Sequence, residues 1–234
     1  MEIKKSDWEK SYKNLDNFIL YPKEEVVKFL NRFVRKKVGF NEFHEILLEN
    51  NEGQTKLKAL DFGCGIGRQT ILLEEFGIEG YGVDISENAI ITAKEFAGHL
   101  NFPELSNRFS VIEGLSIPFE DNFFDISIAE ACLDSMGFKI ASIIIKELDR
   151  VTKSYLFMSL ISGDDSEHDP EFIGDERVKT KHEENTIQSF YNLSRIKKLI
   201  KYTRFNIVFC RLLSEESTIS RYKNSRYYVI LNKN

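Results

Sequence analysis

Five segments rich in apolar residues recur along the chain, and helical patterns follow the first, second and fourth of them. These segments are predicted to be strands and lie near residues 57–62, 80–85, 109–113, 124–129 and 155–161. Strands that alternate with helices form right-handed crossovers in a parallel sheet. Sheets of this kind bind ligands beyond the carboxyl ends of their strands. The pattern therefore predicts an α/β fold with its functional site at that edge.

The segments on either side of this core have their own patterns. Near Tyr21 a helix is predicted, because proline and acids fill its first turn and an apolar stripe follows at Val26, Leu30, Phe33 and Val34. Gly77 is predicted to end the first helix between strands, and Ser86 to cap the second.

The part after the fifth strand begins with a polar stretch. Residues 162–184 are predicted to be a long loop, and a helix is expected from about Thr186 to Tyr202. Two further strand-like segments follow at 205–213 and 226–231. A connection this long without secondary structure is usually a functional loop, so we expect 162–184 to close over a ligand.

Three alternate glycines, Gly63, Gly65 and Gly67, follow the first strand and open a helix. Glycines leave bare backbone at the positive end of that helix, which favours a nucleotide-like ligand. Their GxGxG spacing departs from the dinucleotide fingerprint GxGxxG, which would place glycine where Arg68 stands. A nicotinamide dehydrogenase is therefore a weaker reading, and a tight turn without a ligand is a further alternative.

Asp84 ends the second apolar segment, 23 residues after Asp61. A carboxylate at the tip of this strand can accept hydrogen bonds from both hydroxyls of a ribose. The alternative is a purely structural acid at a helix N-terminus, beside the predicted cap Ser86.

A third segment, residues 111–125, joins a short strand to a loop and then to the strand that begins at Phe124. Together the three segments resemble the class I S-adenosylmethionine-dependent methyltransferases over roughly residues 55–161. The similarity is greatest to the small-molecule branch that includes the ubiquinone and menaquinone biosynthesis methyltransferases. It implies a Rossmann-like three-layer sandwich with a seven-stranded, mostly parallel sheet and one antiparallel strand near the C-terminus.

The resemblance implies S-adenosylmethionine as the cofactor and assigns cofactor contacts by position. In that family the first acid and the glycines hold the methionine part and the adenosine, the acid after strand two holds the ribose, and an acid after strand three meets the adenine. The matching residues here are Asp61, Gly63, Gly65, Gly67, Asp84, Ile85, Glu113, Gly114 and Leu115, with Glu130 facing the methyl donor.

Two segments depart from the family pattern. The usual Gly-Asp-Ala after strand three is Ile-Glu-Gly at 112–114, and the common Lys-Pro-Gly-Gly before strand five is Thr-Lys-Ser-Tyr at 152–155. The first departure weakens the adenine assignment, since Glu113 reaches farther than an aspartate. The second concerns only a turn.

Methyl transfer mainly requires that a nucleophile lie in line with the activated methyl group, and a base is needed only if a proton must leave. His182 is the candidate base, and a solvent-exposed loop histidine is the alternative. Trp8, Tyr12 and Tyr21 are expected to form a lid over the cofactor or to pack as ordinary aromatic residues. Residues 129–132, Ala-Glu-Ala-Cys, lack the proline motifs of the base-modifying enzymes.

Length and charge set further limits. A chain of 234 residues fits one α/β domain, which we divide into an N-terminal helical cap or lid at 1–50 and a catalytic domain at 51–234. The net charge is −5, with −13 in the first 184 residues and +8 in the remainder. This balance argues against a nucleic-acid partner.

No long apolar run or signal core is present, so we expect a cytoplasmic protein without membrane contact. The three scattered cysteines predict neither disulfides nor a metal site.

These observations predict methyl transfer to an O or N atom of a small molecule. We expect residues 162–184, Tyr21 and the helix start near Thr186 to enclose this acceptor, and the basic C-terminal region to attract an acidic group on it. The alternatives are a protein or RNA methyltransferase, and a non-catalytic partner subunit of the same fold. The oligomeric state is not predicted.

Overall fold

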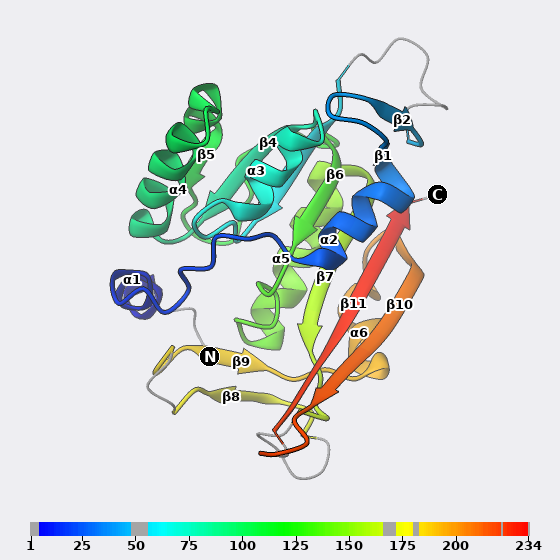
Figure 1. Cartoon of the computed structure of the whole chain (residues 1–234). Helices are drawn as coiled ribbons and strands as arrows, with labels where there is room; N and C mark the ends of the chain where they lie inside the picture. The colour runs from blue at the N-terminus through cyan, green and yellow to red at the C-terminus, as the bar shows by residue number, and fades with distance from the viewer. Residues whose placement is uncertain (1–4, 48–55, 166–171, 180–182, 221, 234) are drawn as a thin grey trace.

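The computed structural model describes residues 5–47, 56–165, 172–179, 183–220 and 222–233, and a seven-stranded mixed sheet forms its centre (Figure 1). The strand order is β10-β11-β7-β6-β3-β4-β5. The strands span Lys58–Phe62 (β3), Glu79–Asp84 (β4), Phe109–Val111 (β5), Phe124–Ala129 (β6), Thr152–Ile161 (β7), Phe205–Glu216 (β10) and Lys223–Lys233 (β11). In this sheet β11 alone runs antiparallel to its neighbours, β7 and β10. The predicted fold is confirmed.

Helices cover both faces of the sheet and complete the three layers. On one face α5 (Phe138–Val151) and α6 (Leu193–Ile200) pack on the apolar side chains of β3, β6, β7 and β11. On the other face α2 (Glu24–Phe29) and α3 (Arg68–Glu75) pack on the alternate side chains of the same strands. The helix α4 (Glu87–His99) lies beside β5, as Figure 1 shows, and the 3₁₀ helix η3 (Pro103–Arg108) precedes that strand.

Local signals in the sequence set the helix ends as predicted. Gly77 follows α3 with φ +65°, a conformation that glycine adopts without strain. The Ser86 hydroxyl caps α4 by accepting a hydrogen bond from the Ala89 N–H at 3.2 Å. The start of α4, directly after β4, is thereby fixed at the carboxyl edge of the sheet.

The region after β7 corrects two predictions. Residues 162–184 are not an uninterrupted loop, because β8 (Asp175–Arg177) pairs with β9 (Ile187–Ser189). The helix does not begin near Thr186, since α6 starts at Leu193 and its cap is Asn192, which accepts from the Arg195 N–H at 2.9 Å. Burial of Ile187 and Ser189 on one side of β9 follows strand periodicity rather than helical periodicity.

The N-terminal part divides between the core and the edge of the sheet. Val26 and Leu30 are fully buried in the layer formed by α2, and a π-helical turn, η1 (Leu30–Val34), continues that helix. A hairpin of β1 (Arg35–Lys37) and β2 (Phe43–Glu45), which the sequence did not predict, follows it. The first helix, α1 (Lys5–Lys13), lies apart from the core next to α4 (Figure 1). Within the described residues, no helix combines the length and apolarity needed to cross a membrane.

Candidate functional site

The turn after β3 lies at the carboxyl edge of the sheet and brings Gly63 and Gly65 close to other parts of the chain. Both have positive φ, +71° and +54°. A Cβ atom on Gly63 would lie 2.3 Å from the Cys132 sulfur, and one on Gly65 would lie 2.6 Å from the Tyr12 hydroxyl. Only glycine fits at these two positions, and both glycines line a cavity.

Gly67 has a different role from the other two glycines. It precedes α3 with φ +84°, and a Cβ atom there would lie 2.7 Å from the Phe109 ring of β5. It is absent from the residues that line the two cavities described below. In this structure Gly67 lets α3 and β5 approach each other, while the cofactor contact predicted for it stays a prediction.

Asp84 is fixed by the backbone at the tip of β4. Its Oδ2 accepts a hydrogen bond from the Gly65 N–H at 2.9 Å, and its Oδ1 accepts one from the Ser86 N–H at 2.9 Å. Burial raises the pKa of this carboxyl above its ordinary value. These bonds show the structural role at the helix N-terminus; the side chain also lines a cavity, and its contact with a ribose stays a prediction.

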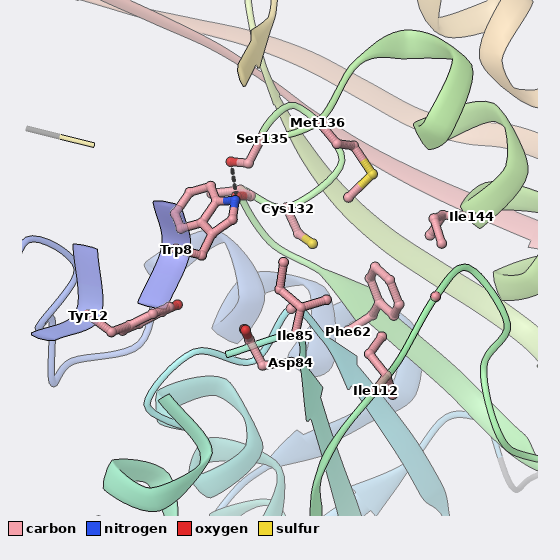
Figure 2. A pocket seen from close by; sticks show the side chains of 13 residues that line it. Trp8, Tyr12, Phe62, Asp84, Ile85, Ile112, Cys132, Ser135, Met136 and Ile144 are labelled. Atoms are coloured by element: carbon pink, nitrogen blue, oxygen red, sulfur yellow. Dashed lines mark hydrogen bonds between the residues drawn. The ribbon is translucent and has the colours of Figure 1, made fainter. Parts of the chain in front are cut away.

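An apolar pocket opens beside Asp84 and runs toward α5. In Figure 2 Asp84 and Tyr12 lie at one end of this apolar pocket, and Ile112 and Ile144 lie at the other. Its further lining comes from Trp8, Phe62, Gly63, Ile85, Gly114, Ala131, Cys132, Ser135 and Met136. Gly114 and Ile85, which are predicted to contact the cofactor, therefore line this pocket, whereas Glu113 is exposed and Leu115 packs against the core.

A larger polar cavity of about 440 Å³ adjoins the apolar pocket. The two share five lining residues, Trp8, Tyr12, Gly63, Ala131 and Ser135. In the polar cavity Arg68 donates to Glu130 at 2.8 Å, and neither polar side-chain atom of the buried Gln69 has a partner among the described residues. Unpartnered buried amides are rare in proteins, so Gln69 is a candidate contact for a polar ligand.

Asp61 lies under the same cavity, at 1% exposure. Its Oδ2 accepts a hydrogen bond from the Thr70 hydroxyl at 2.7 Å. Burial raises the pKa of Asp61 to about 7, and the nearby carboxylates of Glu130 and Asp84 add to the increase, while the Thr70 bond opposes it. A positively charged ligand group would be favoured here.

Comparison with known proteins shows that the part of the chain around this site is similar to methyltransferases. A methyltransferase-domain model matches residues 60–156, which contain the glycine turn, Asp84 and β6. The crystal structure of an S-adenosylmethionine-dependent methyltransferase from Methanosarcina mazei is similar to 80% of this chain and 96% of its own, with 26% identity and a TM-score of 0.63. Residues 60–156 thus match a methyltransferase domain, and the fold around them is similar to that of an S-adenosylmethionine-dependent methyltransferase.

Two curated relatives of this methyltransferase domain come from Synechocystis sp. An uncharacterized methyltransferase is 30% identical over 131 residues, which are 55% of this chain and 58% of the relative. A 2-methyl-6-phytyl-1,4-hydroquinone methyltransferase is 33% identical over 95 residues, which are 40% of this chain and 28% of the relative. The aligned regions thus span less than two thirds of either relative.

The residues of the methyltransferase domain fit its cofactor, S-adenosylmethionine. The apolar pocket next to Asp84 suits an adenine and its ribose, because apolar walls meet a fixed hydrogen-bond acceptor there. In the adjoining polar cavity the unpartnered Gln69 and the partly neutral Asp61 suit the charged methionine end. The bare glycine backbone lies between these two regions.

The helix α1 borders both the apolar pocket and the polar cavity. Trp8 and Tyr12 line both cavities, and Figure 2 shows the Trp8 indole directed toward Ser135. Glu9 attaches the helix to the N-terminus of α4, where it accepts hydrogen bonds from the Ser86 hydroxyl at 3.1 Å and from the N–H groups of Glu87 and Asn88 at 2.6 and 3.2 Å. Trp8 and Tyr12 thus border the site, while their role as a lid over the cofactor stays a prediction.

The other predicted acceptor-side residues have different positions. Tyr21 is 83% exposed and lines neither cavity, although its carbonyl accepts from Arg68 at 3.4 Å. His182 lies outside the described residues, so its role stays a prediction. Burial raises the pKa of the Cys132 thiol well above its ordinary value, which keeps this thiol protonated and a poor nucleophile.

Several lining residues of the polar cavity were not predicted from the sequence, among them Gln69, Asp134, Asp165 and Arg226. Arg226 carried one signal, a charged residue at the start of a strongly apolar strand segment. The described residues include no cluster of histidine, cysteine and carboxylate side chains that could hold a metal ion.

Proposed function

We propose that this protein transfers a methyl group from S-adenosylmethionine to an O or N atom of a small molecule. The observation that carries the proposal is the polar cavity next to the apolar pocket. Its volume of about 440 Å³ lies within the range of ~300–1,000 Å³ that is typical of small-ligand sites. The methionine end of the donor would occupy one part of the cavity and the acceptor the other.

Elements from distant parts of the chain surround the polar cavity. Tyr12 comes from α1, Val178 and Gln188 from the β8–β9 region, and Tyr222 and Asn224 from the end of the β10–β11 hairpin. This enclosure favours a small acceptor over a residue within a folded protein. RNA is disfavoured too, because five carboxylates and only three basic side chains line the cavity.

The resident side chains have distinct tasks in the proposed reaction. S-adenosylmethionine, when bound, supplies the activated methyl group and the leaving sulfur. Asp84 would accept hydrogen bonds from the ribose hydroxyls, and Gln69 would form hydrogen bonds with the methionine end. Trp8 and Tyr12 would exclude water and orient the acceptor. His182 is proposed as the base for acceptors that must lose a proton.

The hydroquinone methyltransferase from Synechocystis sp. supports a small acceptor, since its name describes a small-molecule substrate. The main alternative is a non-catalytic partner subunit that binds the cofactor without transferring its methyl group.

The test is incubation of the protein with isotopically labelled methyl donor and a cell extract separated into small-molecule, protein and RNA fractions. We expect label in the small-molecule fraction, and Asp84→Asn should abolish most of it because the ribose contact is weakened by about 1.5–3 kcal/mol. Label confined to protein or RNA would contradict the small-acceptor proposal. Tight donor binding with no transfer to any fraction would favour the partner subunit instead.

A further inference from the structure

Two buried carboxylates of the polar cavity accept hydrogen bonds from neighbouring residues of β11. Asp134 Oδ2 accepts hydrogen bonds from the Ile161 N–H at 2.8 Å and from the Arg226 guanidinium at 2.7 Å. Asp165 Oδ2 accepts one from the Ser225 N–H at 2.9 Å. Ser225 and Arg226 are consecutive on β11, so both carboxylates lie at one end of the cavity, beside the β7–β11 pairing.

The charges at this end of the polar cavity do not balance. Asp134 and Asp165 are 2% and 3% exposed, and among the described basic side chains that line the cavity only Arg226 forms an ion pair with either of them, by donating to Asp134. Lys223 lies nearby on β11 but pairs with Asp164, whose side chain is about half exposed. One negative charge is therefore left without a cation among the described residues, and a buried charge of this kind is costly unless a ligand compensates it.

Asp134 gives a second, independent sign of a ligand. Its Oδ1 is buried and has no hydrogen-bond partner among the described residues, although carboxylate oxygens in protein interiors nearly always have one. Asp134 therefore has one oxygen bonded to Arg226 and a second oxygen that could accept a hydrogen bond from a ligand.

The methyl donor does not meet this need. At its own end of the cavity Asp61 and Glu130 face the single guanidinium of Arg68. S-adenosylmethionine carries a sulfonium, an ammonium and a carboxylate, so its net positive charge complements that end. The excess carboxylate at the β11 end, Asp165, is therefore left to bind a positive charge on the acceptor.

We propose that the acceptor is an amine-bearing molecule whose protonated amine binds between Asp134 and Asp165. This inference rests on the proposed function and names the substrate class of the same site. It replaces the acidic acceptor expected from the basic C-terminal region, because several of those basic residues are already paired: Arg195 with Asp175, Arg204 and Lys233 with Asp149, and Arg211 with Glu25.

The first test uses three probes of one shape in the presence of saturating S-adenosylhomocysteine: benzylamine, benzyl alcohol and benzoate. We expect benzylamine to bind at least tenfold more tightly than either other probe, since charge-assisted hydrogen bonds contribute most. Equal binding of the three, or a preference for benzoate, would overturn the inference.

Two variants locate the amine site. Asp165→Asn removes the charge with little change in shape and should weaken benzylamine binding about tenfold, while Asp134→Asn should do so at least as strongly. Asp164→Asn is the matched control, because this neighbouring carboxylate does not line the cavity, and it should leave binding within about twofold. Unchanged benzylamine binding in Asp165→Asn and Asp134→Asn, both with normal S-adenosylhomocysteine affinity, would contradict the site.

The second test separates this inference from the proposed function. A small-molecule extract is divided by ion exchange into cationic, neutral and anionic fractions, and each is incubated with labelled methyl donor. We expect label in the cationic fraction. Label only in the neutral or anionic fraction would overturn the amine proposal and leave small-molecule methyl transfer intact, whereas no label in any fraction would contradict the proposed function and leave the probe experiment to decide on the amine site.

Discussion

Of the carboxylates at the carboxyl edge of the sheet, some could be predicted from the sequence and others could not. The sequence placed Asp84 at a strand tip beside Ser86, and the structure shows that its two oxygens hold the glycine turn and the start of α4 together. Position along a strand was sufficient for that prediction. Asp134 and Asp165 could not be found in this way, since their significance depends on contacts with β11, more than 50 residues away.

Asp61 gives a prediction about pH. Because its pKa is raised to about 7, part of the population is protonated at neutral pH, and the ammonium of the donor favours the ionised form. S-adenosylhomocysteine affinity should therefore increase as the pH rises through about 7, by up to about tenfold per unit below that value. Calorimetry at several pH values measures this slope, and Asp61→Asn should flatten it.

The same shift has the opposite consequence for folding. A carboxyl with a raised folded-state pKa binds more protons in the native state than in the unfolded state, so the free energy of unfolding decreases as the pH rises from about 4 to about 7.

The binding prediction has its own contrary outcome. If the affinity for S-adenosylhomocysteine changes with pH equally in the wild type and in Asp61→Asn, the Asp61 carboxyl does not contact the donor.

At the level of elements, the seven strands of the main sheet were predictable, and the strands of the two small hairpins outside it were not. All seven strands of the main sheet follow from apolar runs or alternation that the sequence displays. The strands β8 and β9 contain a single apolar residue, Ile187, and so show no apolar run, and β9 lay within a predicted helix. The pairing that fixes them is antiparallel contact between segments ten or more residues apart.

We expect the attachment of α1 to α4 to control how fast the cofactor dissociates. Glu9→Ala removes the hydrogen bonds to Ser86, Glu87 and Asn88, which are comparable to a helix cap worth about 1 kcal/mol. Dissociation of S-adenosylhomocysteine should become about fivefold faster in stopped-flow measurements, because the lid opens more often.

A control on the same helix is Lys13→Ala, which changes an exposed residue that lines neither cavity. Equal dissociation rates in the wild type, Glu9→Ala and Lys13→Ala would mean that α1 does not limit cofactor release.

For the molecule as a whole, the order of elements predicted the three-layer architecture, while the close contacts inside it depend on packing that no sequence pattern displays. Gly67 illustrates the difference. Gly67→Ala would place a methyl group 2.7 Å from the Phe109 ring at φ +84°, so we expect the free energy of unfolding to decrease by about 1–3 kcal/mol.

The matched control is Gly98→Ala within α4, where no atom lies within 4 Å of the added methyl group. This change should increase the free energy of unfolding by about 0.5–1 kcal/mol, since alanine is the better helix former. Denaturant unfolding of both variants tests the pair, and equal effects would refute the packing role of Gly67.

The wall shared by the apolar pocket and the polar cavity has a consequence for inhibitor design. Trp8, Tyr12, Gly63, Ala131 and Ser135 contact both spaces, so no other layer of protein separates an adenosine in one from an amine in the other. A bisubstrate compound that links adenosine to a protonated amine through a tether long enough to cross the polar cavity would fill both spaces at once. The second half would bind at a high effective concentration, and its affinity would far exceed that of either half alone.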